Sequence, residues 1–497
     1  MAGSASPGRS TPPAVVVVFG ASGDLTNRKV LPALAGLARD NLLDPATALV
    51  GVARTQLDDA DFAARVKRAG PEAGPAWARL AAGARYVAGD DGDPDTFQRL
   101  GAVLDELDRT VGTSGNRLFY LATVPTVFPR IVAALGTAGP GVVAGGRGFT
   151  RIVIEKPFGH DLASAEKLDE VIHDHFDETQ IYRIDHYLGK ETVQNLLALR
   201  FANAIFEPIW NRRYVDHVQI TVAEELGVEE RAGFYESAGA LRDIVQNHLL
   251  QVLALTCMEP PVHVDAKGIR DEKVKVIEAI EPMDPGRVAQ DVVRAQYRSG
   301  TSGGHPVPGY REERGVAPDS QTETFVAARL SIDNWRWNGV PFYIRTGKRL
   351  GARLTEVAMQ FRRVPHLPFA AGDARGLHPN SLVLRIQPDE GICLEFGAKV
   401  PGQGFTVRSV NMDFSYAASF AEQPHDGYER LLLDALTGDP TLFIRSDEAA
   451  SAWRICDPIL SAWADGAGSV VGYPAGSWGP READRLLERD GRRWRHQ

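Results

Sequence analysis

Nine consecutive residues, Arg183 to Glu191 (RIDHYLGKE), hold the densest group of side chains that could do chemistry. Asp185 and His186 are adjacent, so their side chains diverge and are expected to have different roles. His186 and Lys190 would share one face if the segment is helical, where they could hold an anion such as a phosphate. The alternative is a solvated helix N-terminus, which is the commoner meaning of an arbitrary segment of this kind.

A second group of polar side chains interrupts an apolar pattern further along the chain. Apolar residues at helical spacing predict a buried helix over about 241–253, on which Asp243 and His248 are exceptions. A histidine in such a place is most often a hydrogen-bonded core residue. The other interpretation is a general base, because a neutral imidazole with a pKa of about 6.5 accepts a proton near neutral pH. A carboxylate on its second nitrogen would fix its tautomer.

A glycine turn near the N-terminus indicates a coenzyme site. The apolar run 14–19 (AVVVVF) predicts a buried parallel strand, and residues 27–39 predict a helix. Between them lie the residues expected to contact the coenzyme, which are Gly20, Ala21, Ser22, Gly23, Asp24 and Leu25. Glycines let the backbone approach a pyrophosphate, whose charge a helix N-terminus stabilises. The G-x-x-G pattern alone is also compatible with an ordinary strand–helix turn.

The residue after the second predicted strand bears on the choice of coenzyme. This strand, at 48–53, ends at Arg54. An acidic residue near this position usually binds the ribose of NAD, whereas an arginine accommodates the 2′-phosphate of NADP. Arg54 therefore favours NADP, with NAD as a weaker alternative. The other interpretation is a surface arginine at a strand end.

The order of the predicted elements places these groups in two domains. The N-terminal part alternates strands with helices, which predicts an α/β, Rossmann-like, doubly wound parallel sheet. Later strands follow one another with few helices, which predicts a larger α+β domain with a mostly antiparallel sheet. We expect a disordered tail at 1–13, a dinucleotide-binding domain at 14–185, and a substrate-binding and oligomerisation domain at 186–497. Residues 300–319, rich in glycine, proline and charge, predict a long loop.

Charged residues follow several of the predicted strands. The strand at 151–154 leads into Glu155-Lys156-Pro157, which resembles an E-K-P motif found in two-domain sugar oxidoreductases. Pro157 should keep Lys156 extended and aim its ammonium group into a cleft. The strand at 215–224 ends in Glu224, and the strand at 340–346 is followed by Lys348 and Arg353.

Composition narrows the class of protein. The net charge of −9 argues against nucleic acid as a partner. The three cysteines are far apart, which fits a reducing compartment and gives neither a disulfide framework nor a metal site. No apolar run approaches the roughly 20 residues that span a bilayer. We therefore expect a cytoplasmic protein with no metal and no membrane association.

Several strings of residues resemble those of the glucose-6-phosphate dehydrogenases, especially the bacterial ones. They include GASGDLTNRK, RIDHYLGKE, the R-D-x-x-Q-N-H pattern at 242–248 and YPAGSWGP near the C-terminus. The resemblance runs from about Val15 to Pro480. It implies oxidation of glucose 6-phosphate at C1 to 6-phosphoglucono-1,5-lactone, with NADP as coenzyme, in the first step of the oxidative pentose phosphate pathway.

The resemblance also implies individual roles. His248 would be the general base and Asp185 its partner. The other implied ligands are His186, Tyr187 and Lys190 for the phosphate, Glu224 and Asp243 for sugar hydroxyls, Lys348 for the sugar, Lys156 between sugar and nicotinamide, and Asp90 and Asp91 for the coenzyme. Arg353 stands where bacterial relatives often have lysine, so a phosphate contact is implied there less directly.

One departure and two rival functions complete the expectations. Animal members of the family hold a second, structural NADP through basic residues, and Leu354 stands at one of those positions, so that site is not expected here. The family implies a homodimer or homotetramer. A different NAD(P)-dependent sugar oxidoreductase with E-K-P would have no need for His186 with Lys190. A non-catalytic NADPH-binding sensor would have no need for His248 with Asp185.

Overall fold

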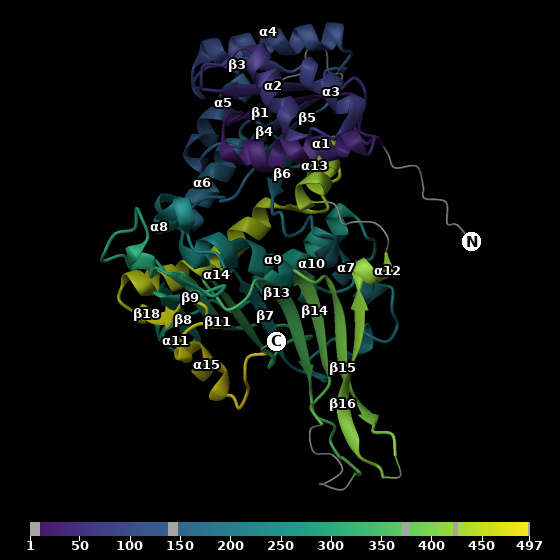
Figure 1. Ribbon diagram of the computed structural model, residues 1–497, viewed down its shortest axis with the longest axis vertical. Helices are drawn as coiled ribbons and strands as arrows, with labels where there is room; N and C mark the ends of the chain where they lie inside the picture. The colour runs from purple at the N-terminus through teal and green to yellow at the C-terminus, as the bar shows by residue number, and fades with distance from the viewer. Residues whose placement is uncertain (1–9, 138–147, 370–376, 403, 421–425, 496–497) are drawn as a thin grey trace, which may run out of the picture. The chain divides into compact units, whose positions relative to one another are not determined.

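The computed structural model describes residues 10–137, 148–369, 377–402, 404–420 and 426–495 (Figure 1). Residues 1–9 of the predicted disordered tail lie outside this range. Thr11 is buried and its N–H donates to the Leu42 carbonyl at 2.8 Å, so the packed chain begins before the predicted residue 14. No described helix is both long enough and apolar enough to cross a membrane.

The chain divides into two compact units. The first contains residues up to Gly189 together with 263–270 and 425–450, and the second contains the remainder. The division falls inside the helices α10 (Ala266–Glu278) and α14 (Ser446–Ala464). The domain boundary expected at 185 stays a prediction, but two later segments clearly group with the N-terminal unit.

The first unit is built on a seven-stranded sheet with the order β17-β6-β5-β4-β1-β2-β3. All neighbouring strands are parallel except β17, which is antiparallel to β6. The strands are β1 (Val15–Phe19), β2 (Ala48–Ala53), β3 (Arg85–Ala88), β4 (Arg117–Leu121), β5 (Thr150–Ile154), β6 (Ile181–Ile184) and β17 (Phe443–Ile444). Apart from β17, this is the strand order of dinucleotide-binding folds, which confirms the predicted doubly wound sheet.

Helices pack in two groups around this sheet, as a doubly wound fold requires. One group contains η1 (Thr26–Val30), α1 (Leu31–Arg39), α2 (Asp59–Ala69), α3 (Gly74–Ala82) and α13 (Gly427–Thr437), and the other α4 (Pro94–Thr110), α5 (Phe128–Thr137) and α6 (Leu162–His173). Two 3₁₀ turns, η2 (Pro125–Val127) and η3 (Glu178–Gln180), complete the unit. The helices α2 and α3 are separated by a break that begins at Gly70, the C-cap of α2.

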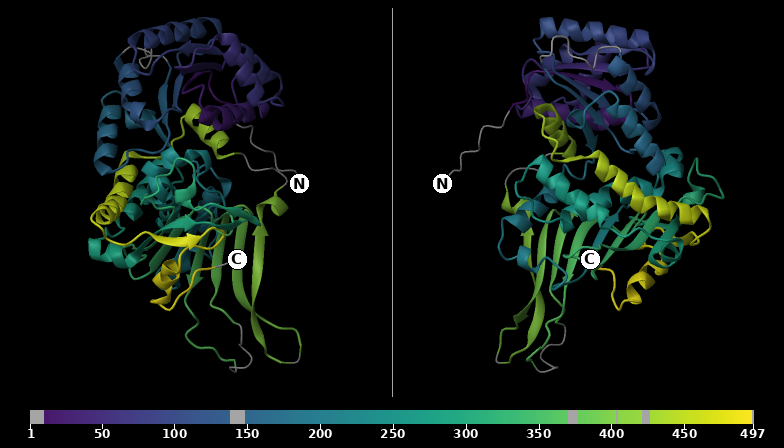
Figure 2. Two further views of the ribbon diagram at one scale, coloured as in Figure 1. Left: turned by 60° about the vertical axis from the view of Figure 1, so that its left-hand side comes forward. Right: turned by 180° about the vertical axis from the view of Figure 1, so that it is seen from behind.

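The second unit is built on a nine-stranded sheet with the order β16-β15-β14-β13-β7-β12-β11-β8-β18 (Figure 2). Only β7·β12 and β8·β18 are parallel, which confirms the predicted mostly antiparallel sheet. The strands are β7 (Val215–Ala223), β8 (Val292–Arg298), β11 (Phe325–Ser331), β12 (Pro341–Gly347), β13 (Leu354–Phe361), β14 (Ser381–Gln387), β15 (Gly391–Lys399), β16 (Val407–Ser415) and β18 (Val471–Pro474).

The remaining elements include the helix that the apolar pattern predicts near 241–253. It consists of a π-helix, η6 (Leu241–Leu249), continued by α9 (Leu250–Cys257). The others are α7 (Glu191–Phe201), η4 (Glu207–Ile209), η5 (Glu229–Arg231), α8 (Ala232–Ala240), α11 (Pro285–Asp291), η7 (Tyr310–Glu312), α12 (Tyr416–Ser419) and α15 (Arg481–Glu488). The long loop expected at 300–319 is wrong in part, because β9 (Gly300–Ser302) and β10 (His305–Val307) form a hairpin there.

Candidate active site

The glycine turn after β1 is shaped by one close backbone approach. Gly20 has φ +78°, and a Cβ there would lie 2.4 Å from the carbonyl oxygen of Ala122. The Thr26 hydroxyl donates to the Gly20 carbonyl at 2.9 Å, which ties the start of η1 to the turn. Of the other predicted coenzyme residues, Ala21 is buried, Ser22, Gly23 and Leu25 are half-buried, and Asp24 is exposed and pairs with Arg28 at 2.7 Å. Only glycine fits at position 20, which suits close approach by a diphosphate.

Two arginines lie at the β2 side of this turn. Arg54 is exposed after β2, and the hydroxyl of its neighbour Thr55 donates to Ser22 Oγ at 2.9 Å. Arg65, on α2, donates from Nη1 to the Ser22 carbonyl at 3.2 Å. Arg65 is not among the residues predicted from the sequence, because nothing in the helix pattern distinguishes it from other polar positions. The structure therefore offers two guanidinium groups where the sequence indicates one.

The two aspartates after β3 have different surroundings. Asp91 is buried, whereas Asp90 is exposed and accepts the Gly92 N–H at 3.2 Å. Burial raises the pKa of Asp91, and the charge of Asp90 adds to this rise, while Arg54 and Arg130 oppose it. Arg54 and Asp91 are thus close enough to interact electrostatically.

The E-K-P motif begins at the end of β5 with a buried carboxylate. Glu155 accepts a hydrogen bond from the Tyr120 hydroxyl at 2.5 Å. Burial raises the pKa of Glu155, while hydrogen bonds from Tyr120 and Tyr428 and the charge of Lys156 oppose the rise. Lys156 is half-buried, and its peptide bond to Pro157 is cis, which the sequence does not reveal.

The middle of the nine-residue segment, residues 185–190, forms a tight turn between β6 and α7, so the helical arrangement considered for it is wrong. Asp185 is buried, its Oδ1 accepts the Tyr187 N–H at 2.9 Å, and its carbonyl accepts the Leu188 N–H at 3.0 Å. The α7 helix starts only at Glu191, with Lys190 as its N-cap. The segment does lead into a helix N-terminus, but not into a solvated one, because Asp185, Tyr187 and Leu188 are all buried.

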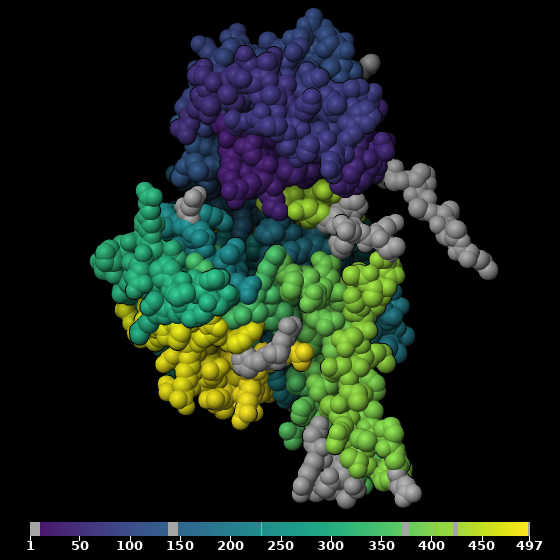
Figure 3. Space-filling model, in the orientation of Figure 1, coloured from purple at the N-terminus to yellow at the C-terminus, as the bar shows by residue number. Residues whose placement is uncertain are grey.

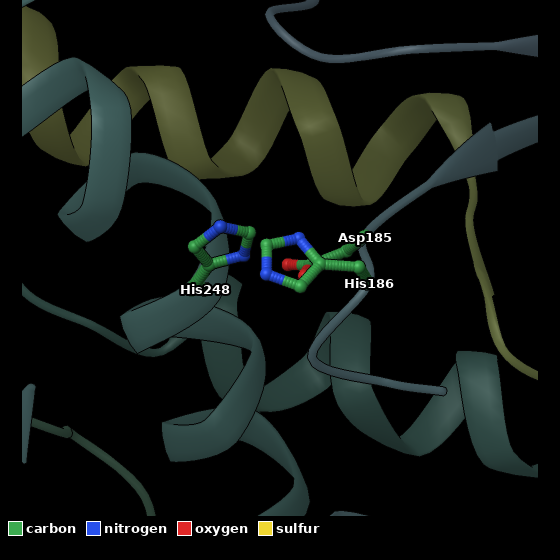
Figure 4. Close-up of side chains that lie close together, drawn as sticks. All are labelled: Asp185, His186 and His248. Carbon is green, nitrogen blue, oxygen red and sulfur yellow. The ribbon is translucent and has the colours of Figure 1, made fainter. Parts of the chain in front are cut away.

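His186 is the half-buried member of this turn. Its ring meets the Tyr187 ring edge-on, with centroids 5.1 Å apart and planes at 69°. Figure 4 draws His186 and Asp185, which follow β6 in the first unit, with His248, which lies on η6 in the second.

The part of the helix that carries His248, η6, is a π-helix, a wider turn often found at functional sites. His248 is 1% exposed, and its backbone N–H donates to Asn247 Oδ1 at 2.6 Å. Asn247 in turn donates from Nδ2 to the Arg242 carbonyl at 3.0 Å. The backbone around His248 is therefore held by side-chain hydrogen bonds.

Glu224 and Lys348 meet at the ends of two paired parallel strands. β7 and β12 run side by side with Ala223 opposite Gly347, so the residues that follow them are neighbours. Lys348 Nζ donates to Glu224 Oε2 at 2.6 Å and lies 5.0 Å from the centroid of the Tyr235 ring. Burial raises the pKa of Tyr235 well above its ordinary value, and the charges of Asp243, Glu323 and Glu224 add to this. Asp243, which is half-buried, therefore lies near this pair.

Lys190 and Arg353 converge on one oxygen atom. Lys190 Nζ and Arg353 Nη2, the latter at 3.4 Å, both donate to Gln387 Oε1 at the end of β14. The amide is oriented by Gln387 Nε2, which donates to Thr355 Oγ1 at 2.9 Å. Lys190 is half-buried and Arg353 exposed. Gln387 gave no signal in the sequence, where it is one polar residue at a strand end.

One group in the first unit has the residue types of a metal site. Asp169, His173 and Glu178 have ligand atoms within 4.8 Å of one another. The buried Arg183 donates to Glu178 at 2.8 Å and to Asp169, and His173 lies 3.1 Å from Glu178. These carboxylates are thus engaged in an ion-pair network that explains their proximity without a metal.

Comparison with known proteins gives consistent matches along the chain. Residues 17–195 match the family domain described as glucose-6-phosphate dehydrogenase, NAD binding domain, and residues 197–495 match the C-terminal domain of the same family. The glucose-6-phosphate 1-dehydrogenase 2 of Mycobacterium tuberculosis is 50% identical over 489 residues, which cover 97% of this chain and 94% of that protein.

Solved structures agree with the sequence matches. A glucose-6-phosphate dehydrogenase in complex with its substrate glucose 6-phosphate has a TM-score of 0.89 at 35% identity, covering 99% of this chain and 100% of that one. The glucose-6-phosphate 1-dehydrogenase of Mycobacterium avium has a TM-score of 0.81 at 38% identity, covering 98% and 99%. Two adjoining domain matches, high identity over nearly the whole length and a shared fold lead to one conclusion: this chain belongs to the glucose-6-phosphate dehydrogenase family.

Proposed function

We propose that this chain oxidises the C1 hydroxyl of glucose 6-phosphate to 6-phospho-glucono-1,5-lactone, with NADP⁺ reduced to NADPH and one proton released. Family membership supports the reaction type. The observation that carries the substrate is the convergence of Lys190 and Arg353 on Gln387 Oε1. Two cations that share one neutral acceptor form a site where a phosphate oxygen can take the place of the amide oxygen.

The glycine turn fits a dinucleotide. A Cβ at Gly20 would fill the space beside Ala122, so the turn stays open to a diphosphate only because the residue is glycine. Arg54 and Arg65 would supply charge for a 2′-phosphate, which favours NADP over NAD, and Asp90 and Asp91 are further proposed contacts of the coenzyme. When bound, the coenzyme supplies the acceptor for the hydride that leaves C1. Lys156, at the end of β5, would orient the sugar toward it.

His248 is the proposed general base. Its imidazole would take the proton of the C1 hydroxyl, and Asp185 would fix the imidazole tautomer and stabilise the imidazolium that results. His248 is 1% exposed, and a charge that forms in such surroundings needs a compensating partner.

The remaining predicted ligands fall into two groups, one for the sugar hydroxyls and one for the phosphate. Glu224 and Asp243 would accept hydrogen bonds from sugar hydroxyls, with Lys348 donating to a hydroxyl from the same pair. His186, Tyr187, Lys190 and Arg353 would donate to the phosphate. Binding energy gained at the phosphate, away from C1, would then orient the reacting carbon.

An initial-rate assay tests the proposal directly. The purified protein should reduce NADP with glucose 6-phosphate at a kcat/KM far above that with free glucose, and it should use NAD less well. Equal rates with phosphorylated and free sugar would refute the proposed substrate. Equal use of both coenzymes would refute the role of Arg54 and Arg65.

We also propose that the chain forms a homodimer or a homotetramer through β16. This strand is the edge of its sheet, with β15 its one neighbour, and Figure 3 shows both strands along the surface (green). Val410 and Met412 on β16 and Phe405 before it are 39%, 60% and 66% exposed. An edge strand with exposed apolar side chains invites pairing with another chain.

Sedimentation velocity tests this oligomer. Met412→Glu places a charge on the proposed interface and should lower the sedimentation coefficient, whereas Met283→Leu, in the core, should leave it unchanged.

We also propose a cytoplasmic location, on the basis of the cysteines. All three cysteines, Cys257, Cys393 and Cys456, are buried thiols without disulfides. Proteins of reducing compartments keep cysteines in this state.

A further inference from the structure

The start of α13 lies directly against the turn that carries His186, and both belong to the first unit. A Cβ on Gly189 would lie 2.4 Å from the Gly427 carbonyl oxygen. A Cβ on Gly427 would lie 2.8 Å from the His186 carbonyl oxygen. Two glycines, more than 200 residues apart in the chain, thus allow backbone to pack on backbone. Such an approach fixes the residue that follows Gly427.

That residue, Tyr428, stacks on the imidazole of His186. The ring centroids are 6.0 Å apart and the planes differ by 13°. With the edge-on ring of Tyr187, His186 is thus bounded by two aromatic rings. Tyr428 is 7% exposed, so its ring has little freedom to move away.

Tyr428 is itself held at both ends. Its hydroxyl is hydrogen-bonded to the buried Glu155, and the same carboxylate accepts from Tyr120. Its backbone N–H donates to Asp426 Oδ1 at 2.9 Å, and Asp426 pairs with Lys29 at 3.0 Å. The Lys29 ammonium lies 5.7 Å from the centroid of the Tyr428 ring. Through Tyr428, these contacts connect Glu155 of the E-K-P motif to the turn that carries His186.

We propose that Tyr428 is a positioning residue for His186, and that Glu155 orients Tyr428. The inference rests on the proposed function of His186 as a phosphate ligand. A half-buried histidine can adopt several rotamers, and those that turn away from the phosphate lower the affinity. Stacking against a fixed ring removes these rotamers before substrate binds. The E-K-P motif thereby contributes to phosphate binding through Glu155. Through Lys156 it also contributes to the orientation of the reacting end of the sugar.

Four variants test this arrangement with KM and kcat measured separately. Tyr428→Leu removes the ring and should raise KM for glucose 6-phosphate about 5- to 10-fold, within the range of roughly 2- to 13-fold for loss of an aromatic pair. Its kcat and its KM for NADP should change less than about twofold. Tyr428→Phe keeps the ring and should restore KM to within about threefold. His186→Asn should raise KM for the phosphorylated sugar, and Tyr428→Leu combined with His186→Asn should raise it no further.

Tyr182→Leu is the matched control, since Tyr182 is buried in the same unit and packs on Phe443. It should leave KM for glucose 6-phosphate unchanged. If Tyr428→Leu does not fold, Tyr428→Met, which keeps volume without a ring, replaces it with the same expected values.

The outcomes separate the two proposals. If His186→Asn leaves KM for glucose 6-phosphate unchanged, the phosphate role of His186 is refuted, and the positioning role with it. If His186→Asn raises KM but Tyr428→Leu does not, only the positioning role is refuted. The positioning role is likewise refuted if the two effects multiply in the double variant, or if Tyr182→Leu raises KM as much as Tyr428→Leu.

Discussion

Replacing Lys190 by alanine tests the proposed phosphate site most sharply. Lys190 is half-buried at the N-cap of α7 and donates to Gln387 Oε1, the atom that Arg353 reaches at 3.4 Å. A phosphate oxygen in place of the amide oxygen would receive a charge-assisted hydrogen bond from Lys190. We expect Lys190→Ala to lower kcat/KM for glucose 6-phosphate sharply while barely changing the slow reaction with glucose.

The size of the loss follows from the surroundings of the two cations. A hydrogen bond to a charged group contributes about 1.5–3 kcal/mol, which corresponds to roughly 10- to 150-fold in kcat/KM. Arg353 is exposed, so its contribution should resemble that of a surface ion pair, about 0.2–1 kcal/mol, or less than about fivefold. Lys190→Ala should therefore cost clearly more than Arg353→Ala.

Initial rates of NADPH formation with both sugars, on the parent and on each variant, give the comparison. Lys275→Ala is a control, because it removes an exposed lysine that pairs with Glu272 at 2.7 Å on α10. General misfolding would lower the rates with both sugars together. An equal loss for phosphorylated and free sugar in Lys190→Ala would refute Lys190 as a phosphate ligand.

Three further predictions concern the base, the coenzyme and acid stability. His248→Asn should fold and bind glucose 6-phosphate while kcat falls at least about 100-fold, and near-normal turnover would exclude His248 as the base. Arg54→Ala and Arg65→Ala should each raise the Kd of NADP more than that of NAD, whereas Arg79→Ala, on α3, should change neither; equal losses for both coenzymes would contradict a 2′-phosphate site. Burial raises the pKa of Asp108, but hydrogen bonds from Arg117, Thr113 and the Gly115 N–H outweigh it and leave the value at about 2. Because the folded pKa lies below the unfolded one, the carboxylate stabilises the fold above pH about 4, a contribution lost as pH falls toward 2. The Tm deficit of Asp108→Asn should thus shrink over that range, and a deficit that stays constant would show that Asp108 does not titrate in this way.

The parts of the site that lie at strand ends could be predicted from the sequence. An apolar run marks a strand, and the residues after it stand at the edge of the sheet. Gly20 after β1, Glu155 after β5 and Glu224 after β7 are placed in this way. The same rule explains why Glu224 and Lys348 meet, since their strands are parallel neighbours, although the pairing of β7 with β12 could not be seen in the sequence.

Other parts depend on local bonds that periodicity does not register. His186 and Lys190 have helical spacing, but the Asp185 carboxylate captures the Tyr187 N–H and stabilises a turn. The π-helix that carries His248 has an apolar face, but it is short. Over this length the spacing of its apolar residues does not distinguish it from an α-helix. The hairpin at β9 and β10 does have a signal in the sequence. Gly303 and Gly304 both have positive φ, at 57° and 81°, as a two-residue Gly-Gly turn requires.

Three residues of the proposed coenzyme and phosphate sites could not be predicted from the sequence. Gln387, Arg65 and Tyr428 each belong to an ordinary strand, helix or helix start. Their importance comes from what lies opposite them in the fold, and no pattern along the chain records that. For Tyr428, the only nearby feature of the sequence is the glycine at 427, which has no side chain and so permits the close approach to His186.

Lys190 and Lys348 donate to different kinds of acceptor. This difference suggests how a chain with net charge −9 could bind an anionic sugar. Lys348 donates to the carboxylate of Glu224, so the pair is close to neutral as a whole and suits hydroxyl groups, which need both a donor and an acceptor. Lys190 and Arg353 donate to the neutral amide of Gln387, so two cationic donors are oriented toward one point. A dianionic phosphate gains most where cationic donors are held in place before it binds. The same residue type thus suits two ends of one substrate, because its hydrogen-bond acceptor differs.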